Sequence, residues 1–330
     1  MDCETQWTPP VVCGEGASGE RGMSARGLPA RIGGILLLLW FVATVTFVLM
    51  FAVPQDPGAA IAGPQATPQV TENIRKVLGL DQPLHVQYGR YLWRLVHGDL
   101  GRSYVFGRPV VELLTSHLGP SFQLALACVV AEAAIGLPVG ILSAVRPGSR
   151  FDRLAMVGTL VTLGLPHFWI GLFLLYLVGA RLGWLPIGGY GGFTFLILPA
   201  LAVGIAYAGW YARVIRSTLL DIMARDYVRT ARSKGVPERG VILRHALRNA
   251  LIPVVTMWGL DFANFMSGLV VIETVFGWPG IGAQMVEAVL RFDVPLAMGT
   301  VLVAAVIVGV VNLVLDFVYP VLDPRLRHHA

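Results

Sequence analysis

The sequence predicts an all-α, polytopic membrane protein with six membrane-spanning helices. Of its 330 residues, 55% are hydrophobic and only 14% are charged, and the mean hydropathy is +0.67. A soluble domain carries about 25% charged residues, so this chain has too few to cover a water-exposed surface. The same composition excludes a disordered, collagen-like or coiled-coil chain. The three cysteines have neither the spacing of a zinc site nor that of a disulfide framework.

Six apolar segments are long enough to cross the membrane, which requires about 20 residues of helix. They are residues 32–53, 122–145, 154–180, 193–213, 251–276 and 295–318. The fourth is interrupted by Gly204, Tyr207, Gly209 and Tyr211. The first also resembles a signal peptide followed by the small residues of a cleavage site at 60–62. Its apolar core of about 20 residues exceeds the 7–15 of a signal peptide, so we interpret it as an anchor.

The distribution of basic residues predicts the orientation of these spans. Of the 25 Lys and Arg residues, 17 fall on the side that carries both termini and 8 on the other. Because Lys and Arg accumulate on the cytoplasmic side, we expect both termini inside. The chain then divides into a cytoplasmic tail (1–31), the first spanning helix (32–53), an extracytoplasmic helical segment (54–120), a membrane domain (121–320) and a cytoplasmic tail (321–330). Met23 is an alternative start to Met1, since residues 1–22 show no periodicity.

The extracytoplasmic segment is predicted to contain two helices. Thr67 and Pro68 supply an N-cap and a proline at the first helical position, and Gly79 ends the first run of apolar residues at helical spacing. A second amphipathic helix covers 84–97. This segment is either a cap packed on the spanning helices or a docking surface for a soluble partner, and the residues alone favour the cap.

A long charged segment, residues 221–250, separates the fourth and fifth spans. Proline disfavours helix at the residue before it, so Gly235-Val236-Pro237 should divide the segment into two short helices. Tyr227 and Ala231 lie on one face of the first, with Gly235 at its end. Small residues there would let another protein's backbone approach closely. An amphipathic helix lying on the lipid surface is the alternative that composition supports.

The pattern Thr230-Ala231, then Gly235, then Leu251-Ile252-Pro253 resembles the cytoplasmic coupling loop of binding-protein-dependent ABC importer permeases. That loop carries Ala-Ala, a glycine four residues later and a later Ile/Leu-Pro pair, so Thr230 replaces the first alanine. The resemblance assigns coupling to an ATPase to residues of the first short helix and the turn after it: Asp226, Tyr227, Arg229, Thr230, Ala231 and Gly235.

Further motifs extend the resemblance over nearly the whole chain from Arg31. In order, they are Leu78-Gly79-Leu80-Asp81-Gln82-Pro83, Gly98-Asp99-Leu100-Gly101-Arg102-Ser103, Trp184-Leu185-Pro186, the run from Glu273 to Gly282 and the run from Asp316 to Arg325. Each motif alone is weak. Their order and spacing together are similar to the dipeptide, oligopeptide and nickel group of these permeases, and to the first of its two permease subunits (dipeptide-permease-B-like).

The resemblance implies a type I ABC importer permease fold with a cytoplasmic coupling helix, in a bacterial or archaeal plasma membrane. The implied partners are a second homologous permease, two ATP-binding cassette ATPase subunits, an extracytoplasmic solute-binding protein and a peptide substrate, with no nucleic acid. ATP and Mg²⁺ would be bound by the ATPase subunits, and this chain would carry no cofactor, no metal and no catalytic residue. The sequence is consistent with ATP binding on other subunits, because neither of its two lysines, Lys76 and Lys234, stands in a P-loop motif.

Polar residues inside the spans are costly and face a cavity or a partner by default. Glu132, Asp261 and Asn264 are therefore predicted to line the translocation pathway or a subunit interface. A second set, Glu273, Gly277, Trp278, Pro279 and Gly280, is predicted to form an outer gate loop, since irregular backbone near the membrane persists only where protein or water satisfies it. Trp278 is either the anchor of this loop or an interfacial aromatic residue.

Other functions remain as alternatives. A nickel or metal-chelate importer would share the same permease pattern, so the sequence does not name the substrate. A secondary transporter would also have polar residues and broken helices in the membrane, but the chain shows no repeated halves. An intramembrane protease would need a Ser–His pair, a Gly-x-Gly-Asp motif or a zinc motif in a span, and none is present.

Overall fold

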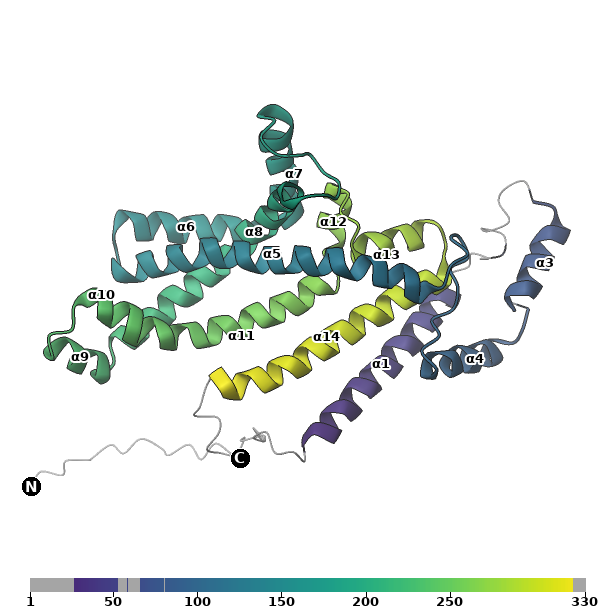
Figure 1. The fold of residues 1–330 in the computed structure, drawn as a ribbon, viewed down its shortest axis with the longest axis horizontal. Coiled ribbons are helices and arrows are strands. Elements are labelled where there is room, and N and C mark those ends of the chain that lie inside the picture. Colours follow the sequence, from purple (N-terminus) through teal and green to yellow (C-terminus); the bar gives the residue numbers. More distant parts are fainter. Residues whose placement is uncertain (1–26, 53–57, 59–65, 80, 323–330) are drawn as a thin grey trace, which may run out of the picture.

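The computed structural model describes residues 27–52, 58, 66–79 and 81–322. Within these residues every regular element is a helix, and Figure 1 shows the helices forming an elongated bundle. The predicted tails fall largely outside the described residues. The all-α prediction is confirmed.

Four helices are each long and apolar enough to cross a membrane. They are α1 (Gly27–Ala52), α5 (Val110–Val145), α8 (Phe193–Met223) and α14 (Val294–Leu322). Two further candidates are bent pairs: α6 (Arg150–Gly164) with α7 (His167–Leu174) and the π-helical turn η1 (Leu175–Arg181), and α11 (Leu247–Met266) with α12 (Val270–Phe276). The described residues thus contain four continuous spans, or six when each bent pair counts as one.

The two bends have local causes in the sequence. The first, of 101°, follows Pro166, which holds Leu165 in an extended conformation at φ −95° and ψ 128°. The second, of 60°, lies at Gly268, whose φ of +115° is accessible to glycine. A Cβ at Gly268 would also come within 3.0 Å of the Gly282 backbone. Spans three and five are therefore broken, where the apolar pattern predicted continuous helices.

Close packing of α5 on α8 forms the centre of the bundle (Figure 1). Gly136 and Gly140 lie one turn apart on α5, and a Cβ on either would clash with α8. The nearest atoms would be Tyr211 Cβ at 2.9 Å for Gly136 and the Ala212 carbonyl oxygen at 2.7 Å for Gly140. Small residues four apart let membrane helices approach at their backbones, so these glycines set the distance between the two helices.

The segment before α5 contains the two expected helices, α3 (Pro68–Leu78) and α4 (Leu84–Val96). Gly79 ends α3 in the left-handed conformation, at φ +69°. Helix α4 packs on α1 through Tyr88, whose hydroxyl lies 2.7 Å from the Thr44 hydroxyl, and through Tyr91, whose ring stacks on Phe47. These contacts favour the packed cap over a free docking segment.

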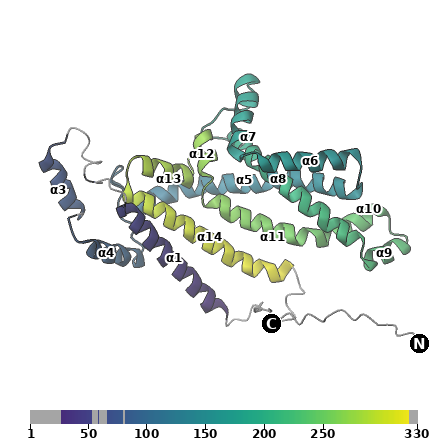
Figure 2. The ribbon, with the colours of Figure 1, turned by 180° about the vertical axis from the view of Figure 1, so that it is seen from behind.

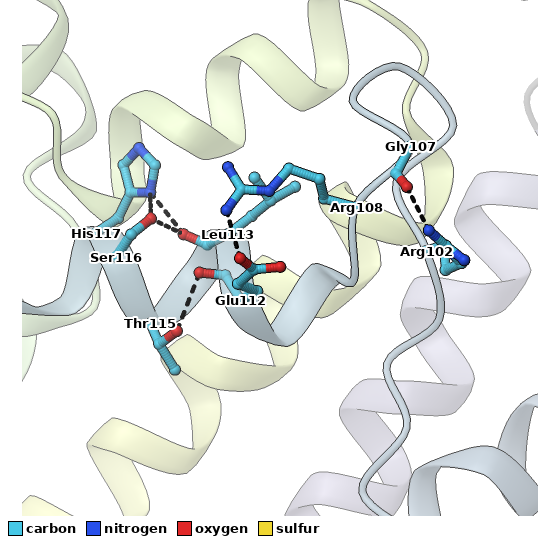
Figure 3. A network of polar contacts seen from close by, with 8 residues as sticks. All are labelled: Arg102, Gly107, Arg108, Glu112, Leu113, Thr115, Ser116 and His117. Carbon is cyan, nitrogen blue, oxygen red and sulfur yellow. Dashed lines mark hydrogen bonds and ion pairs between the residues drawn. The ribbon is translucent and has the colours of Figure 1, made fainter.

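The loop from α4 to α5 is tied to the start of α14. Figure 3 shows Arg102 donating to the Gly107 carbonyl at 2.8 Å, and Arg108 paired with Glu112 at 2.5 Å. The buried carboxylate of Asp293 accepts hydrogen bonds from the Ser103 hydroxyl and from the Tyr104 amide at 3.1 Å. The motif ending at Ser103 therefore has a structural role: it anchors the loop to the residue preceding α14.

Two ion pairs join the ends of helices. Arg216 of α8 makes two bonds, of 2.6 and 2.8 Å, to the carboxylate of Asp152 at the start of α6. Arg31 of α1 lies 2.5 Å from Asp316 of α14. The second pair accounts for Asp316, which the sequence places near the cytoplasmic boundary.

Candidate functional site

The segment predicted to couple to an ATPase lies at one end of the bundle, beside the α5–α6 connection (Figures 1 and 2). It consists of α9 (Asp226–Ser233), a turn at 234–237, the short α10 (Glu238–Gly240) and the π-helical turn η2 (Val241–Ala246). The break at Pro237 is as predicted. The second helix differs from the prediction of a short helix, because α10 and η2 continue directly into α11.

One face of α9 is packed inside the chain. Val228 and Ala231 are buried against Val241 and Ala246 of η2 and Leu219 of α8. Ala231 is only 9% exposed. In this structure the small side chain of Ala231 lets α9 lie close to its own bundle, and the coupling role assigned to Ala231 stays a prediction.

The other face of α9 is open to solvent. The side chains of Asp226 and Arg229 are 97% and 77% exposed, and Thr230 is also exposed. Tyr227 is 40% exposed, and its hydroxyl accepts a hydrogen bond from Asn249 Nδ2 at 3.1 Å. Four of the six residues assigned to coupling thus share one accessible surface, which we call the α9 surface (Asp226, Tyr227, Arg229 and Thr230).

Gly235 forms the turn at the end of α9. Its φ is +77°, and a Cβ at this position would meet no atom within 4 Å. Across the turn, Arg232 pairs with Glu238 at 2.7 Å, and this hydrogen bond lowers the pKa of the Glu238 carboxyl. The turn is thus held by an ion pair, with open space outside Gly235.

A cavity of about 520 Å³ lies within the membrane part of the chain, between the end of α6, α8 and α11. Asp261 and Asn264 line it, together with His167, Tyr207 and Trp210. The Asp261 carboxylate accepts hydrogen bonds from the Tyr211 hydroxyl and from the Asn264 side chain. Two of the three predicted pathway residues therefore meet at one open cavity.

Glu132 is placed differently from the other two pathway candidates. Its side chain is fully buried in α5, and it is not among the residues that line the cavity. Neither carboxyl oxygen has a hydrogen-bond partner among the described residues.

The predicted gate loop connects α12 to α13 (Ile281–Leu290) and is built around Glu273. The fully buried Glu273 carboxylate accepts hydrogen bonds from Ser121 Oγ at 3.2 Å and from the Ala283 amide at 2.8 Å. The Ser121 hydroxyl in turn accepts from the Ile281 amide at 2.8 Å. A carboxylate at the start of α13 satisfies free amides and interacts favourably with the helix dipole. Glu273 therefore holds the loop in place by hydrogen bonds from inside it. Ser121 contributes to the same network and was not identified from the sequence.

Glycines make room for this carboxylate and close the loop. A Cβ on Gly280 would lie 2.2 Å from Glu273 Oε1, while Gly277 ends α12 in the left-handed conformation at φ +61°. Trp278 is 2% exposed, and its indole donates a hydrogen bond to the Pro120 carbonyl at 2.9 Å. Of the two interpretations of Trp278, the structure supports the buried anchor.

Replacing Trp278 with phenylalanine should lower stability moderately. The phenyl ring keeps most of the packing, including the edge contact with Tyr190, but it removes the hydrogen bond to Pro120. We expect a loss of about 1 kcal/mol, seen as a lower melting temperature of the detergent-purified protein. Trp93→Phe is the matched control, because Trp93 is 68% exposed. Equal shifts for the two variants would contradict the anchor role.

Comparisons with known families cover most of the chain. Residues 136–328 match the family described as binding-protein-dependent transport system inner membrane component. Residues 25–125 match the N-terminal family of the same transport system membrane component.

Among individual relatives, the glutathione transport system permease protein GsiC of Salmonella paratyphi A is 40% identical over 298 residues, covering 90% of this chain and 97% of that protein. A putative peptide transport system permease protein of Brucella abortus is 39% identical over 306 residues, covering 90% of this chain and 98% of that protein.

Solved structures resemble the fold at much lower identity. Two crystal forms of the MetNI methionine ABC transporter, in inward-facing conformations, match with TM-scores of 0.54 and 0.55 at 16% and 15% identity. Each covers 64% of this chain, and 96% and 97% of the transporter chain respectively. Family match, relatives and fold agree, and the chain therefore belongs to the inner membrane components of binding-protein-dependent transport systems.

Proposed function

We propose that this chain is the first of two homologous permease subunits in an ATP-driven importer of peptides. The observation that carries the proposal is its identity of 39–40%, over 90% of the chain, with a glutathione permease and a putative peptide permease. Glutathione is itself a tripeptide, so the substrates named for these two relatives are both peptides.

In this proposal the α9 surface binds an ATPase subunit. The support is geometric: α9 lies at the end of the bundle, presents charged side chains to solvent and packs its other face on η2 and α8 through Val228 and Ala231. A displacement of α9 would thereby be transmitted to α8, which packs closely on α5 at the centre of the bundle. The exposed Gly235 turn would lie at the rim of the same contact.

The proposed orientation places α9 in the cytoplasm. Figure 1 shows the start of α1, the α5–α6 connection, α9 and the end of α14 toward one end of the bundle, and the α4–α5 loop and the start of α14 toward the other. The basic residues of the sequence favour the first end as cytoplasmic. The loop between α12 and α13 and the α3–α4 segment would then face the solute-binding protein.

Affinity purification tests this assignment. The chain, tagged and extracted from its native membranes in mild detergent, should bring with it a second permease, two ATPase subunits and a solute-binding protein. Mass spectrometry of the ligand carried by that binding protein should identify a peptide. Recovery of the chain alone, under conditions that preserve other importers, would contradict the proposed assembly and favour a secondary transporter. If the binding protein carries a metal chelate, the chain belongs instead to a nickel or metal-chelate importer, and the proposed peptide substrate is wrong.

A further inference from the structure

The membrane cavity beside α11 has an unbalanced charge. Asp261 is the one carboxylate among its lining residues, and no Lys or Arg lines it. Asp261 receives hydrogen bonds from two neutral groups, Tyr211 and Asn264, and forms no ion pair among the described residues. An acidic residue inside the membrane is expensive and is normally paired or in contact with a polar passage. The Asp261 carboxylate therefore has no cationic side chain beside it among the described residues that line the cavity.

A second carboxyl group lies behind the cavity wall. Glu132 is fully buried, and its two oxygens have no hydrogen-bond partner among the described residues. A Cβ on Gly204 of α8 would lie 3.1 Å from the backbone nitrogen of Glu132, and Gly204 is about one turn from Tyr207, which lines the cavity. The Asp261 carboxylate, in low-dielectric surroundings, makes the cavity attractive to a cation.

The remaining lining groups fit an organic cation. Tyr207 and Trp210 provide aromatic surface, and His167 and Asn264 provide polar atoms. An ammonium group binds to carboxylate oxygens as a hydrogen-bond donor and packs favourably on aromatic faces. The volume of about 520 Å³ is within the roughly 300–1,000 Å³ typical of small-ligand sites, so it can hold part of a short peptide.

We propose that Asp261 binds the primary ammonium group of the substrate while the substrate passes through the membrane. The inference rests on the proposed peptide function and adds a residue that selects among substrates. Asn264 and Tyr211 hold the carboxylate in place as positioning residues. A peptide's own positive charge would offset the cost of the acidic residue during passage.

Direct binding to the purified importer, without its solute-binding protein, tests this proposal. The importer in lipid nanodiscs is titrated with radiolabelled trialanine and with its N-acetyl form. We expect the wild type to bind trialanine about tenfold more tightly than the acetylated peptide, equivalent to roughly 1.4 kcal/mol. Asp261→Asn should lose this preference by weakening trialanine binding while leaving the acetylated peptide unaffected, and Asp261→Glu should retain most of it.

Asp316→Asn is the matched control, since it removes a carboxylate of the same chain that pairs with Arg31 and does not line the cavity. It should bind both peptides like the wild type. N-acetyl-Ala-Lys-Ala distinguishes the two sources of an ammonium group: tight binding assigns the site to any primary ammonium, and weak binding restricts it to the peptide N-terminus.

Two results would overturn the proposal. One is that Asp261→Asn binds both peptides as the wild type does, with the same preference for trialanine. The other is that Asp261→Asn weakens the binding of trialanine and of the acetylated peptide equally, so that Asp261 does not distinguish the ammonium group. ATP-driven uptake with the binding protein, measured in parallel, separates the inference from the proposed function. Normal peptide uptake with no ammonium preference removes the inference alone, whereas absence of any peptide uptake by the wild type removes the peptide function.

Discussion

Replacing Gly235 with tryptophan is expected to abolish peptide uptake while leaving the amount of protein in the membrane unchanged. The residue lies in a turn beyond α9 with open space around it, so the indole would project from the chain instead of disrupting its core. A non-glycine residue at φ +77° adds strain of roughly 1–3 kcal/mol, confined to the turn. The added bulk would keep an ATPase from seating on the α9 surface.

Three variants separate bulk from strain in this prediction. Gly235→Asn should retain most uptake, because asparagine tolerates the left-handed conformation and is small. Thr230→Trp adds bulk on the α9 surface at an exposed helical position and should block uptake without backbone strain. Leu37→Trp adds the same bulk at a position 64% exposed on α1, away from the α9 surface, and should leave uptake intact. Uptake and ATP hydrolysis are measured in vesicles containing the complete importer, and normal uptake by both Gly235→Trp and Thr230→Trp would contradict the coupling assignment.

Replacing Gly280 with alanine is expected to destabilise the loop between α12 and α13 through Glu273. The new methyl group would lie 2.2 Å from Oε1 of that carboxylate, which would have to move away from Ser121 and the Ala283 amide. Overpacking of this kind costs about 1–3 kcal/mol, and unsatisfied buried donors add to it. Glu273→Ala alone should cost roughly 1–3 kcal/mol for each buried donor that it leaves without an acceptor, namely Ser121 Oγ and the Ala283 amide.

The double variant identifies the cause. With Glu273 already replaced by alanine, the clash is gone, and Gly280→Ala should cost less than about 1 kcal/mol. A coupling energy of at least about 1 kcal/mol between the two positions is therefore expected in thermal denaturation of the detergent-purified protein. Additive effects would show that Gly280 is required for another reason. Gly34→Ala is a control, since its Cβ would meet nothing within 4 Å.

Local signals predicted part of this fold well. The bounds of α3 were predicted from Thr67, Pro68 and Gly79. The helix begins at Pro68, directly after Thr67, and ends at Leu78, directly before Gly79. Pro166 carries an equally local signal for the break between α6 and α7, but a long apolar run conceals it when spans are identified by hydropathy alone. The bend at Gly268 depends on its contact with Gly282, which no local pattern reveals.

The candidate site was predicted less completely, because its contacts join distant segments. Asp261 and Asn264 could be selected as polar groups within an apolar span, yet their meeting with Tyr211 and His167 depends on how α7, α8 and α11 pack. Ser121 bonds to Glu273 across 152 positions, and a serine has no sequence signal for such a role. Ala231 matched the coupling motif, but its burial against α8 and η2 emerges only from the fold.

The chain belongs to the inner membrane components of binding-protein-dependent transport systems. The most direct test of its proposed role is uptake by the importer reconstituted in sealed vesicles with its ATPase subunits and binding protein. Labelled peptide should accumulate only when both ATP and the binding protein are present, and Gly235→Trp should abolish accumulation. Accumulation driven by an ion gradient without ATP, or equal in the Gly235→Trp variant, would contradict the account.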